Sequence, residues 1–316
     1  MYKIKGMGFR AEEILKRLPQ CAIHSVFQKA VNLSTREGNL LTIGRKDMEM
    51  GPCTLVSSLD DSISWLDFKL EKGYPVDVTG GGITLLPGLV LAGLPASGIW
   101  YPASLKELPL PGCTEKILDR MALIPVQLKQ TNGVEGIGPL IPWIARRFFP
   151  DGPGPGGCGP VDWGAGILSL YRAVASGDLS AVACRSASLA GLGPGLTPSG
   201  DDFLCGLMLA FVITCKAFRE PPEKFRDICM TILHSASSLT HTLSRHFLEL
   251  AAEGLPGETA EEVILYMLGI QEINIEEAVR RMTGWGAFSG FDQLAGILLG
   301  IRAALVQCEP RTARAR

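Results

Sequence analysis

The groups in this sequence that are best placed to do chemistry lie in a glycine-rich stretch directly before an apolar segment. The stretch reads GLGPGLTPSGDD from Gly191 to Asp202, and the run FLCGLMLAFVITC follows at Phe203. A loop that leads into a helix needs one capping residue and at most one glycine. The surplus of glycines, hydroxyls and carboxylates therefore indicates a binding site. Gly193 and Gly195 flank a proline, and we predict that their peptide N–H groups form a concave surface for an anion.

The hydroxyls and carboxylates at the end of the stretch divide between helix capping and chemistry. Thr197 followed by a proline fits an N-cap with proline at the first helical position, and Ser199 with Asp202 is an alternative cap. Either arrangement uses one hydroxyl and one acid. We therefore predict that Asp202 is a structural cap, and that Asp201 and Ser199 act on the ligand. The stretch is neither a Walker A loop nor a GxGxxG fingerprint.

Two carboxylates beside an anion site raise a question of charge, which has two answers. A divalent cation such as Mg²⁺ could bridge Asp201, Asp202 and a phosphate oxygen, because hard oxygen ligands suit that ion. Alternatively, a carboxylate could accept hydrogen bonds from an amide on a ligand whose other end is anionic, with no cofactor at all. A small metabolite with both a phosphate or carboxylate and an NH₂ group would satisfy the stretch.

The same pattern occurs a second time, 90 residues further along the chain. SGDDFLCGLMLA from Ser199 and SGFDQLAGILLG from Ser289 agree at six of twelve positions. Each is a polar turn followed by a helix that is apolar all round, and such a helix must lie inside a domain. The mid-helix glycines, Gly206 and Gly296, predict that the two helices cross closely. Their N-termini would then meet and form an anion site, unless the two segments are alike only because buried helices resemble each other.

A line of polar side chains follows one face of a long helix that we predict over residues 223–254. His234, Ser238, His241 and Arg245 are spaced by four, three and four residues, which places them on one helical face. This face is either exposed to solvent or lines the ligand cleft. In the cleft, Arg245 would hold a carboxylate or phosphate and His241 would be a third catalytic residue, as a proton donor. The complete predicted set of substrate- or anion-binding residues is Gly193, Gly195, Thr197, Ser199, Gly200, Arg245, Ser289, Gly290 and Asp292.

The elements that position these residues change in type along the chain. Short segments with many β-branched residues, separated by glycine turns, fill the first part, and a strand over 22–34 pairs with one over 40–44 across the turn REGN. Helical periodicity begins near Thr114 and continues in most later segments. We therefore predict an α+β protein: a small β-sheet or barrel over 1–113, then a mainly helical domain over 114–316 with two buried central helices.

Composition excludes several classes of partner. The net charge is −2 and aromatic residues make up 7% of the chain, which argues against nucleic acid. The run from Phe203 to Cys215 is too short to cross a membrane, and glycines and prolines interrupt the apolar stretch over 82–100. The nine cysteines include no CxxC pair, which is typical of reduced thiols in a cytoplasmic protein. The stretch DGPGPGGCGP over 151–160 is either a connector or a loop over the ligand site.

The two glycine-rich motifs also carry a resemblance to a known family. GLGPGLTPSGDDFLCG, together with the later GWGAFSGFDQLAGILLG, is similar to the signature of a bacterial family long described only as a domain of unknown function. One branch of that family is a subunit of the oxamate carbamoyltransferase of allantoin degradation. The resemblance covers the C-terminal two-thirds of the chain, including the helix THTLSRHFLELAAEG.

The resemblance implies carbamoyl transfer between an oxamate-like amide and phosphate, in a complex with other subunits. Carbamoyl phosphate and oxamate each pair an anionic end with an amide, which agrees with the ligand expected from the residues. A second function stays open, because the sequence contains no obvious nucleophile and base pair. The chain would then be a non-catalytic subunit that binds an anionic metabolite or serves as a scaffold.

Overall fold

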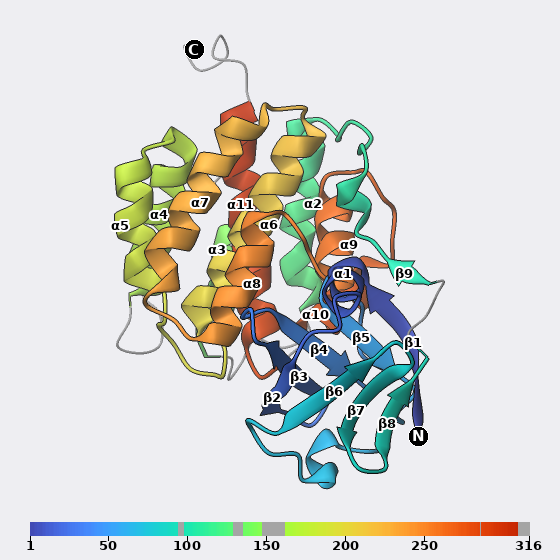
Figure 1. The fold of residues 1–316 in the computed structure, drawn as a ribbon. Helices are drawn as coiled ribbons and strands as arrows, with labels where there is room; N and C mark the ends of the chain where they lie inside the picture. Colours follow the sequence, from blue (N-terminus) through green and yellow to red (C-terminus); the bar gives the residue numbers. More distant parts are fainter. Residues whose placement is uncertain (94–97, 129–134, 147–161, 285, 309–316) are drawn as a thin grey trace, which may run out of the picture. The chain divides into compact units, whose positions relative to one another are not determined.

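The computed structural model describes residues 1–93, 98–128, 135–146, 162–284 and 286–308. The chain divides into two compact units, Met1–Leu105 and Lys106–Arg316. The first is a barrel-like β-sheet and the second is mainly helical (Figure 1), so the predicted α+β class is confirmed.

Eight strands of the first unit close into a ring. The order is β5-β4-β3-β2-β6-β7-β8-β1, and β1 also pairs with β5, which completes the barrel. A short strand β9 adds to β1 in parallel. Inward-facing side chains such as Leu33, Ile43 and Leu55 are fully buried and form the core of this unit. The strands are β1 (Tyr2–Gly8), β2 (Cys21–Val26), β3 (Ala30–Thr35), β4 (Leu40–Gly44), β5 (Thr54–Ser57), β6 (Pro75–Thr79), β7 (Gly82–Leu86), β8 (Leu89–Ala92) and β9 (Ile99–Trp100), with helix α1 (Phe9–Leu15) after β1.

The predicted hairpin at REGN is confirmed, with one difference. Strands β3 and β4 pair antiparallel, and Ser34 lies opposite Leu40 across the turn. The single strand predicted over 22–34 is two strands, because the chain reverses between β2 and β3. The peptide N–H of Phe27 donates to the carbonyl of Ala30 at 2.8 Å and closes that turn. The polar Gln28 and Lys29 fill it.

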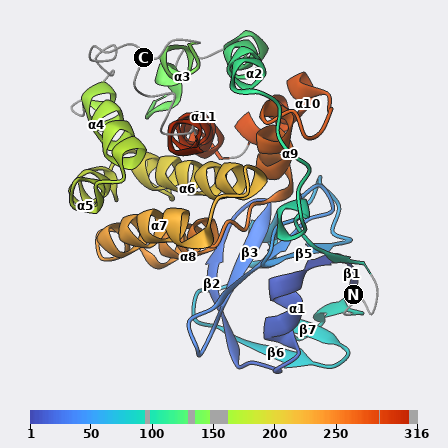
Figure 2. The same cartoon turned by 90° about the horizontal axis from the view of Figure 1, so that it is seen from above.

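The second unit packs its helices around a central pair. Helix α11 lies inside this unit against α6 (Figure 2), and these two helices make the most extensive contact between any two elements. Both are buried along most of their length, as predicted for the two apolar segments. The α-helices are α2 (Thr114–Gln127), α3 (Ile141–Ile144), α4 (Trp163–Ser176), α5 (Leu179–Leu189), α6 (Ser199–Ala217), α7 (Pro222–Ser237), α8 (Thr242–Ala252), α9 (Glu258–Met267), α10 (Ile275–Thr283) and α11 (Ser289–Cys308).

By length and composition α11 could span a membrane, but most of it is buried within the protein. Its buried face packs against α6, α3 and α4, as expected of a core helix. Each of the eight cysteines in the described ranges is a free thiol. The stretch over 151–160, for which we predict either a connector or a loop over the ligand site, lies outside the described residues.

The prediction of one long helix over 223–254 is wrong in one respect, because the segment forms two helices with a break between them. Helix α7 ends at Ser237 and α8 begins at Thr242, with His241 as its N-cap residue. The break has a structural reason. The carbonyl oxygen of Leu239 lies so close to Gly191 that a Cβ there would be 2.3 Å from it, and the turn therefore rests on the glycine-rich loop. The predicted one-face polar stripe is divided between two helices.

Candidate functional site

The starts of α6 and α11 lie side by side, as the repeated motif predicts. The hydroxyl of Thr197 donates to Asp202 Oδ2 at 2.8 Å. The same hydroxyl lies 3.0 Å from Ser289 Oγ, at the start of the other helix. Residues that are 92 positions apart in the chain therefore share a hydrogen bond. We use the name helix-start cluster for the five polar side chains at these two helix starts: Thr197, Ser199, Asp202, Ser289 and Asp292.

The two helices are related by a local twofold axis that follows the 90-residue offset. A Cβ on Gly206 would lie 2.0 Å from the carbonyl oxygen of Gln293, and a Cβ on Gly296 would lie 2.0 Å from that of Phe203. Each contact becomes the other when 90 is added to or subtracted from the residue numbers. Because no side chain larger than hydrogen fits, the backbones touch at the crossing. The predicted close approach at both glycines is confirmed.

A similar contact, although without the constant 90-residue offset, occurs at the N-terminal ends of the two helices. Gly200 sits against the carbonyl of Leu189 at the end of α5, and Gly290 sits against the carbonyl of Met282 near the end of α10. A Cβ would be 1.9 Å from the first oxygen and 1.8 Å from the second. Each half is thus a helix, a glycine turn and an SG-x-D helix start. This repeat of geometry supports a true internal duplication over a chance likeness of buried helices.

The capping differs from both arrangements predicted from the sequence. The N-cap residue of α6 is Pro198, and no side chain caps this end. Its carbonyl accepts the peptide N–H groups of Asp201 at 2.9 Å and Asp202 at 3.1 Å. Thr197 and Ser199 are therefore not N-caps, and the Asp202 carboxylate faces the other helix instead of its own first turn.

Asp202 is a partly buried carboxyl group with only hydroxyl donors. Its pKa is raised to about 7, mainly because of burial. The hydrogen bonds from Thr197 and Ser289 lower the pKa, and the neighbouring charges of Asp292 and Asp201 raise it. Within the described residues no peptide N–H donates to it. A carboxyl with this pKa exists in both protonation states near neutral pH.

Asp292 is the counterpart of Asp202 in the second half, but it is fully buried. Its Oδ1 accepts the peptide N–H groups of Ile137 at 2.7 Å and Gly138 at 3.1 Å. Burial raises its pKa to about 6, while the nearby Ser199 hydroxyl and the two peptide groups lower it. Ser199 Oγ and Asp292 Oδ2 lack a hydrogen-bond partner of good geometry in the described part of the chain. The pairing is reciprocal: each aspartate faces the serine that begins the other helix.

The segment that covers Asp292 comes from a distant part of the chain. Gly136 has a φ of +81°, and a Cβ there would lie 2.5 Å from Ser199 Oγ and 2.8 Å from Asp292 Oδ1. Only a glycine allows the backbone to approach the pair this closely. Sequence reasoning missed Gly136, Ile137 and Gly138. The pattern Gly-x-Gly-Pro was visible, but one sequence does not connect it to a residue 155 positions away.

Asp201 is already engaged by the protein, although the sequence suggested that its carboxylate was available for a ligand. Its Oδ1 accepts the peptide N–H of Gly191 at 2.8 Å, and its Oδ2 accepts the hydroxyl of Thr240. The side chain is 1% exposed. Asp201 therefore ties the glycine-rich loop to the turn between α7 and α8, and its counterpart Phe291 has no such task.

The other predicted residues lie at varying distance from this cluster. Gly193 has a φ of +99° and packs on Ser199, while both Gly193 and Gly195 are exposed on the loop. His241 is exposed at the start of α8. Arg245 is exposed as well, and its Nε donates to the carbonyl of Ser237 at 3.0 Å. Neither His241 nor Arg245 hydrogen-bonds a member of the helix-start cluster.

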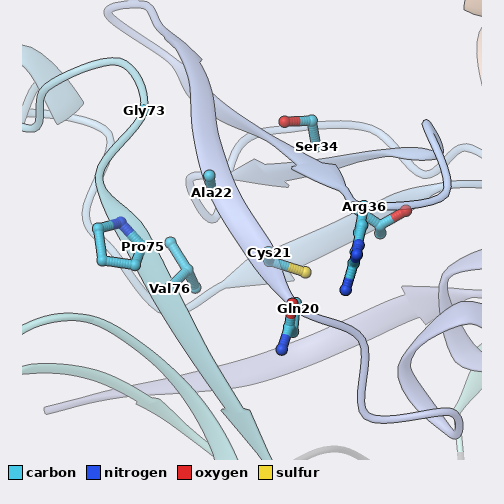
Figure 3. Close-up of a pocket in the computed structure, with 9 residues that line it drawn as sticks. Gln20, Cys21, Ala22, Ser34, Arg36, Gly73, Pro75 and Val76 are labelled. Atoms are coloured by element: carbon cyan, nitrogen blue, oxygen red, sulfur yellow. The ribbon is translucent and has the colours of Figure 1, made fainter.

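Two further features of the structure concern ligands. In the part of the chain that the structure describes, no group of three or more His, Cys, Asp and Glu side chains is arranged to hold a metal ion. A pocket of about 590 Å³ lies in the β unit between β2 and β6 (Figure 3), with Cys21 and Ala22 facing Pro75 and Val76. None of the predicted site residues lines it.

Comparison with known proteins identifies the family. Residues 189–301 match the family model described as oxamate carbamoyltransferase subunit AllH, and residues 6–93 match the AllH family N-terminal domain. The first match spans both SG-x-D helix starts, and the second spans nearly all of the barrel. No solved structure matches the chain. The two matches together cover most of the sequence, and the chain belongs to the AllH family of oxamate carbamoyltransferase subunits.

Proposed function

We propose that this chain takes part directly in carbamoyl transfer to oxamate and binds substrate at the helix-start cluster. One observation carries the proposal: two helix N-termini meet there, with two carboxyls and three hydroxyls between them. The positive ends of the helices favour the anionic groups of carbamoyl phosphate and oxamate. The carboxyls and hydroxyls provide acceptors for the NH₂ groups that both substrates carry.

The proposed chemistry needs positioning and one proton acceptor. The amide nitrogen of oxamate attacks the carbonyl carbon of carbamoyl phosphate, and a C–N bond forms. The C–O bond to phosphate breaks, and its electron pair leaves on the phosphate. A proton from the amide nitrogen passes to a carboxylate of the cluster. Peptide N–H groups of the loop over 191–197 stabilise the charge on the departing phosphate.

The sequence also suggested Mg²⁺ at Asp201 and Asp202. Asp201 accepts a hydrogen bond at each oxygen, so the protein offers Asp202 as the better placed of the two carboxylates. A metal ion would then arrive with the substrate phosphate. Assays with EDTA, followed by addition of Mg²⁺, decide whether the reaction needs the ion.

The family name and the free thiols support two further proposals, one on partner subunits and one on cellular location. The family name describes one subunit of a carbamoyltransferase, so we propose that this chain assembles with other subunits. We propose that it functions in the cytoplasm, in the pathway of allantoin degradation. Purification of the complex identifies its subunits, and fractionation of the cells measures its location.

The experiment that tests the proposed function is a transfer assay with defined components. The chain alone, its partner subunits alone and the assembled complex are each supplied with carbamoyl phosphate and oxamate, and the release of phosphate is measured. We expect transfer by the complex, and its loss when Ser289→Ala and Thr197→Val are combined in this chain. Full activity of that double variant in the complex would favour the alternative, a scaffolding subunit that does not touch the substrates.

A further inference from the structure

The local twofold axis creates two similar carboxyl sites, and only one of them is filled by the protein. At Asp292, two successive peptide N–H groups, from Ile137 and Gly138, donate to one oxygen at 2.7 and 3.1 Å. At Asp202, its counterpart across the axis, no peptide N–H from the described residues takes that position. The comparison shows what kind of donor the geometry accepts, because the chain itself supplies that donor in one half.

The donor that fits is an N–H group of a planar amide. In the second half the segment over 136–138 reaches Asp292 because Gly136 removes every side-chain atom between the backbone and the carboxylate. In the first half Asp202 is half-buried, whereas Asp292 is fully buried, and we therefore expect a small molecule to reach Asp202 from solvent. The hydroxyls of Thr197 and Ser289 already lie beside it and align it.

The first half differs from the second in a way that favours a replaceable partner. The counterpart of Thr197 in the second half is Ala287, which has no hydroxyl. Asp202 therefore has a hydroxyl beside it that Asp292 lacks. A hydroxyl rotates and both donates and accepts, whereas a peptide N–H is fixed and only donates. A carboxylate held by hydroxyls can therefore exchange partners with a ligand, and one held by two peptide groups cannot do so without moving the backbone.

The Asp292 half is not fully satisfied either. Ser199 Oγ and Asp292 Oδ2 are fully buried, face each other, and make no hydrogen bond of good geometry in the described part of the chain. Buried polar atoms without partners are rare in folded proteins, and they mark places where a ligand or a water completes the network.

We propose that Asp202 accepts hydrogen bonds from the NH₂ group of the amide substrate, in the position that the peptide groups of Ile137 and Gly138 occupy at Asp292. Asp202 is thus the residue that selects an amide over a carboxylate, whereas Asp292 organises the fold of the site. This inference rests on the proposed function for the identity of the substrate, oxamate. It does not depend on which subunit activates carbamoyl phosphate.

The test compares two probes that differ only at the atom in question. Oxalate has the size and shape of oxamate, but an anionic oxygen replaces the NH₂ group. Binding of each to the purified full chain is measured by calorimetry near pH 8, where Asp202 is mostly ionised. We expect oxamate to bind at least about tenfold more tightly than oxalate, because a carboxylate repels the second carboxylate of oxalate.

Asp202→Asn is the main variant and Thr197→Val the second, and both are checked for folding by circular dichroism. Asp202→Asn should reduce the preference for oxamate to within about twofold, because a neutral amide side chain no longer repels oxalate. Thr197→Val removes a hydroxyl that aligns Asp202 and should lower the preference partially. Asp201→Asn is the matched control, since Asp201 points to the loop and the α7–α8 turn, and it should keep the preference.

The outcomes separate this inference from the proposed function. A preference for oxamate that survives both Asp202→Asn and Thr197→Val overturns the inference, even if the complex transfers carbamoyl groups. An oxamate preference that depends on Asp202, in a complex without transfer activity, supports the inference and contradicts the proposed catalysis. No binding of oxamate, by the chain or by the assembled complex, overturns both.

Discussion

The two SG-x-D helix starts have nearly the same backbone and different hydrogen-bond partners. Pro198 and Phe288 occupy equivalent positions, and each carbonyl accepts the peptide N–H groups three and four residues later, at 2.9 and 3.1 Å in both halves. In the second half the aspartate holds a distant segment of the chain. In the first half the aspartate is half-buried and lies against the hydroxyls of Thr197 and Ser289. We propose that the duplicated scaffold retains one copy for stability and leaves the other for binding.

The strongest way to break the relation between the halves is to separate the helices where they cross. Gly206→Ala and Gly296→Ala each place a Cβ about 2 Å from a carbonyl oxygen of the other helix. We expect a loss of at least about 3 kcal/mol of unfolding free energy for each, because backbone against backbone cannot repack. Chemical denaturation measures the loss.

Gly112→Ala is the control for this experiment, because its Cβ would be 3.6 Å from the nearest carbonyl oxygen, an ordinary contact. We expect the control to stay within about 1 kcal/mol of the wild type. If Gly206→Ala and Gly296→Ala gave very different losses, the crossing would not have the twofold symmetry described above.

The pairing of buried carboxyls predicts how stability depends on pH. The folded pKa values, about 7 for Asp202 and about 6 for Asp292, lie above the ordinary value of 3.8. Between pH 4 and 7 the folded state therefore binds more protons than the unfolded state, and stability falls as pH rises. One such group lowers the unfolding free energy by about 1.4 kcal/mol per pH unit across its window.

Asp202→Asn tests the assignment of that pH dependence. The variant cannot ionise, so we expect it to be more stable than the wild type at pH 8 and to lose less stability between pH 4 and 7. Thermal melts at half-unit pH intervals give the two curves. Parallel curves for variant and wild type would show that Asp202 is not the titrating group.

A smaller effect should follow from loosening the glycine-rich loop without touching the two facing carboxyls. Asp201→Asn weakens the bonds to Gly191 and Thr240, and Thr240→Val removes only one of them. We expect losses of about 1–3 kcal/mol for the first and about 1 kcal/mol for the second. Hydrogen exchange should be faster at Gly191 in both variants. Unchanged exchange at Gly191 would contradict the role of Asp201 as a tie between loop and turn.

The sequence predicted the architecture of this site better than the roles within it. The 90-residue repeat, the two apolar helices and the mid-helix glycines were sufficient to place the segment 289–292 near the segment 199–202, because burial and close crossing follow from residue type. The division of labour between Asp201 and Asp202 was not predictable. It depends on Thr240 and on the segment over 136–138, which reach the site only through tertiary packing.

The broken helix illustrates the same limit in local structure. The segment over 223–254 has helical periodicity throughout, and nothing in its pattern marks a stop at Ser237. The break arises because the turn after α7 packs on Gly191, which has a φ of +71° and no side chain. Periodicity reports which residues favour a helix, but a long-range contact decides where this helix ends.

The smallest expected effect concerns His241, which the sequence suggested as a proton donor. Its side chain is exposed, makes no capping bond to α8 and hydrogen-bonds no member of the helix-start cluster. We expect His241→Ala to keep carbamoyl transfer by the complex within about threefold of the wild type, because the side chain makes no hydrogen bond to the helix-start cluster and surface substitutions rarely change the unfolding free energy by more than about 0.5 kcal/mol. The measurement is the rate of phosphate release at saturating substrates, with Asp202→Asn assayed beside it. A loss at His241 as large as that at Asp202 would mean that the turn between α7 and α8 moves over the loop during the reaction. In that case the site would include the turn between α7 and α8 as a third element, in contact with the Asp202 half alone.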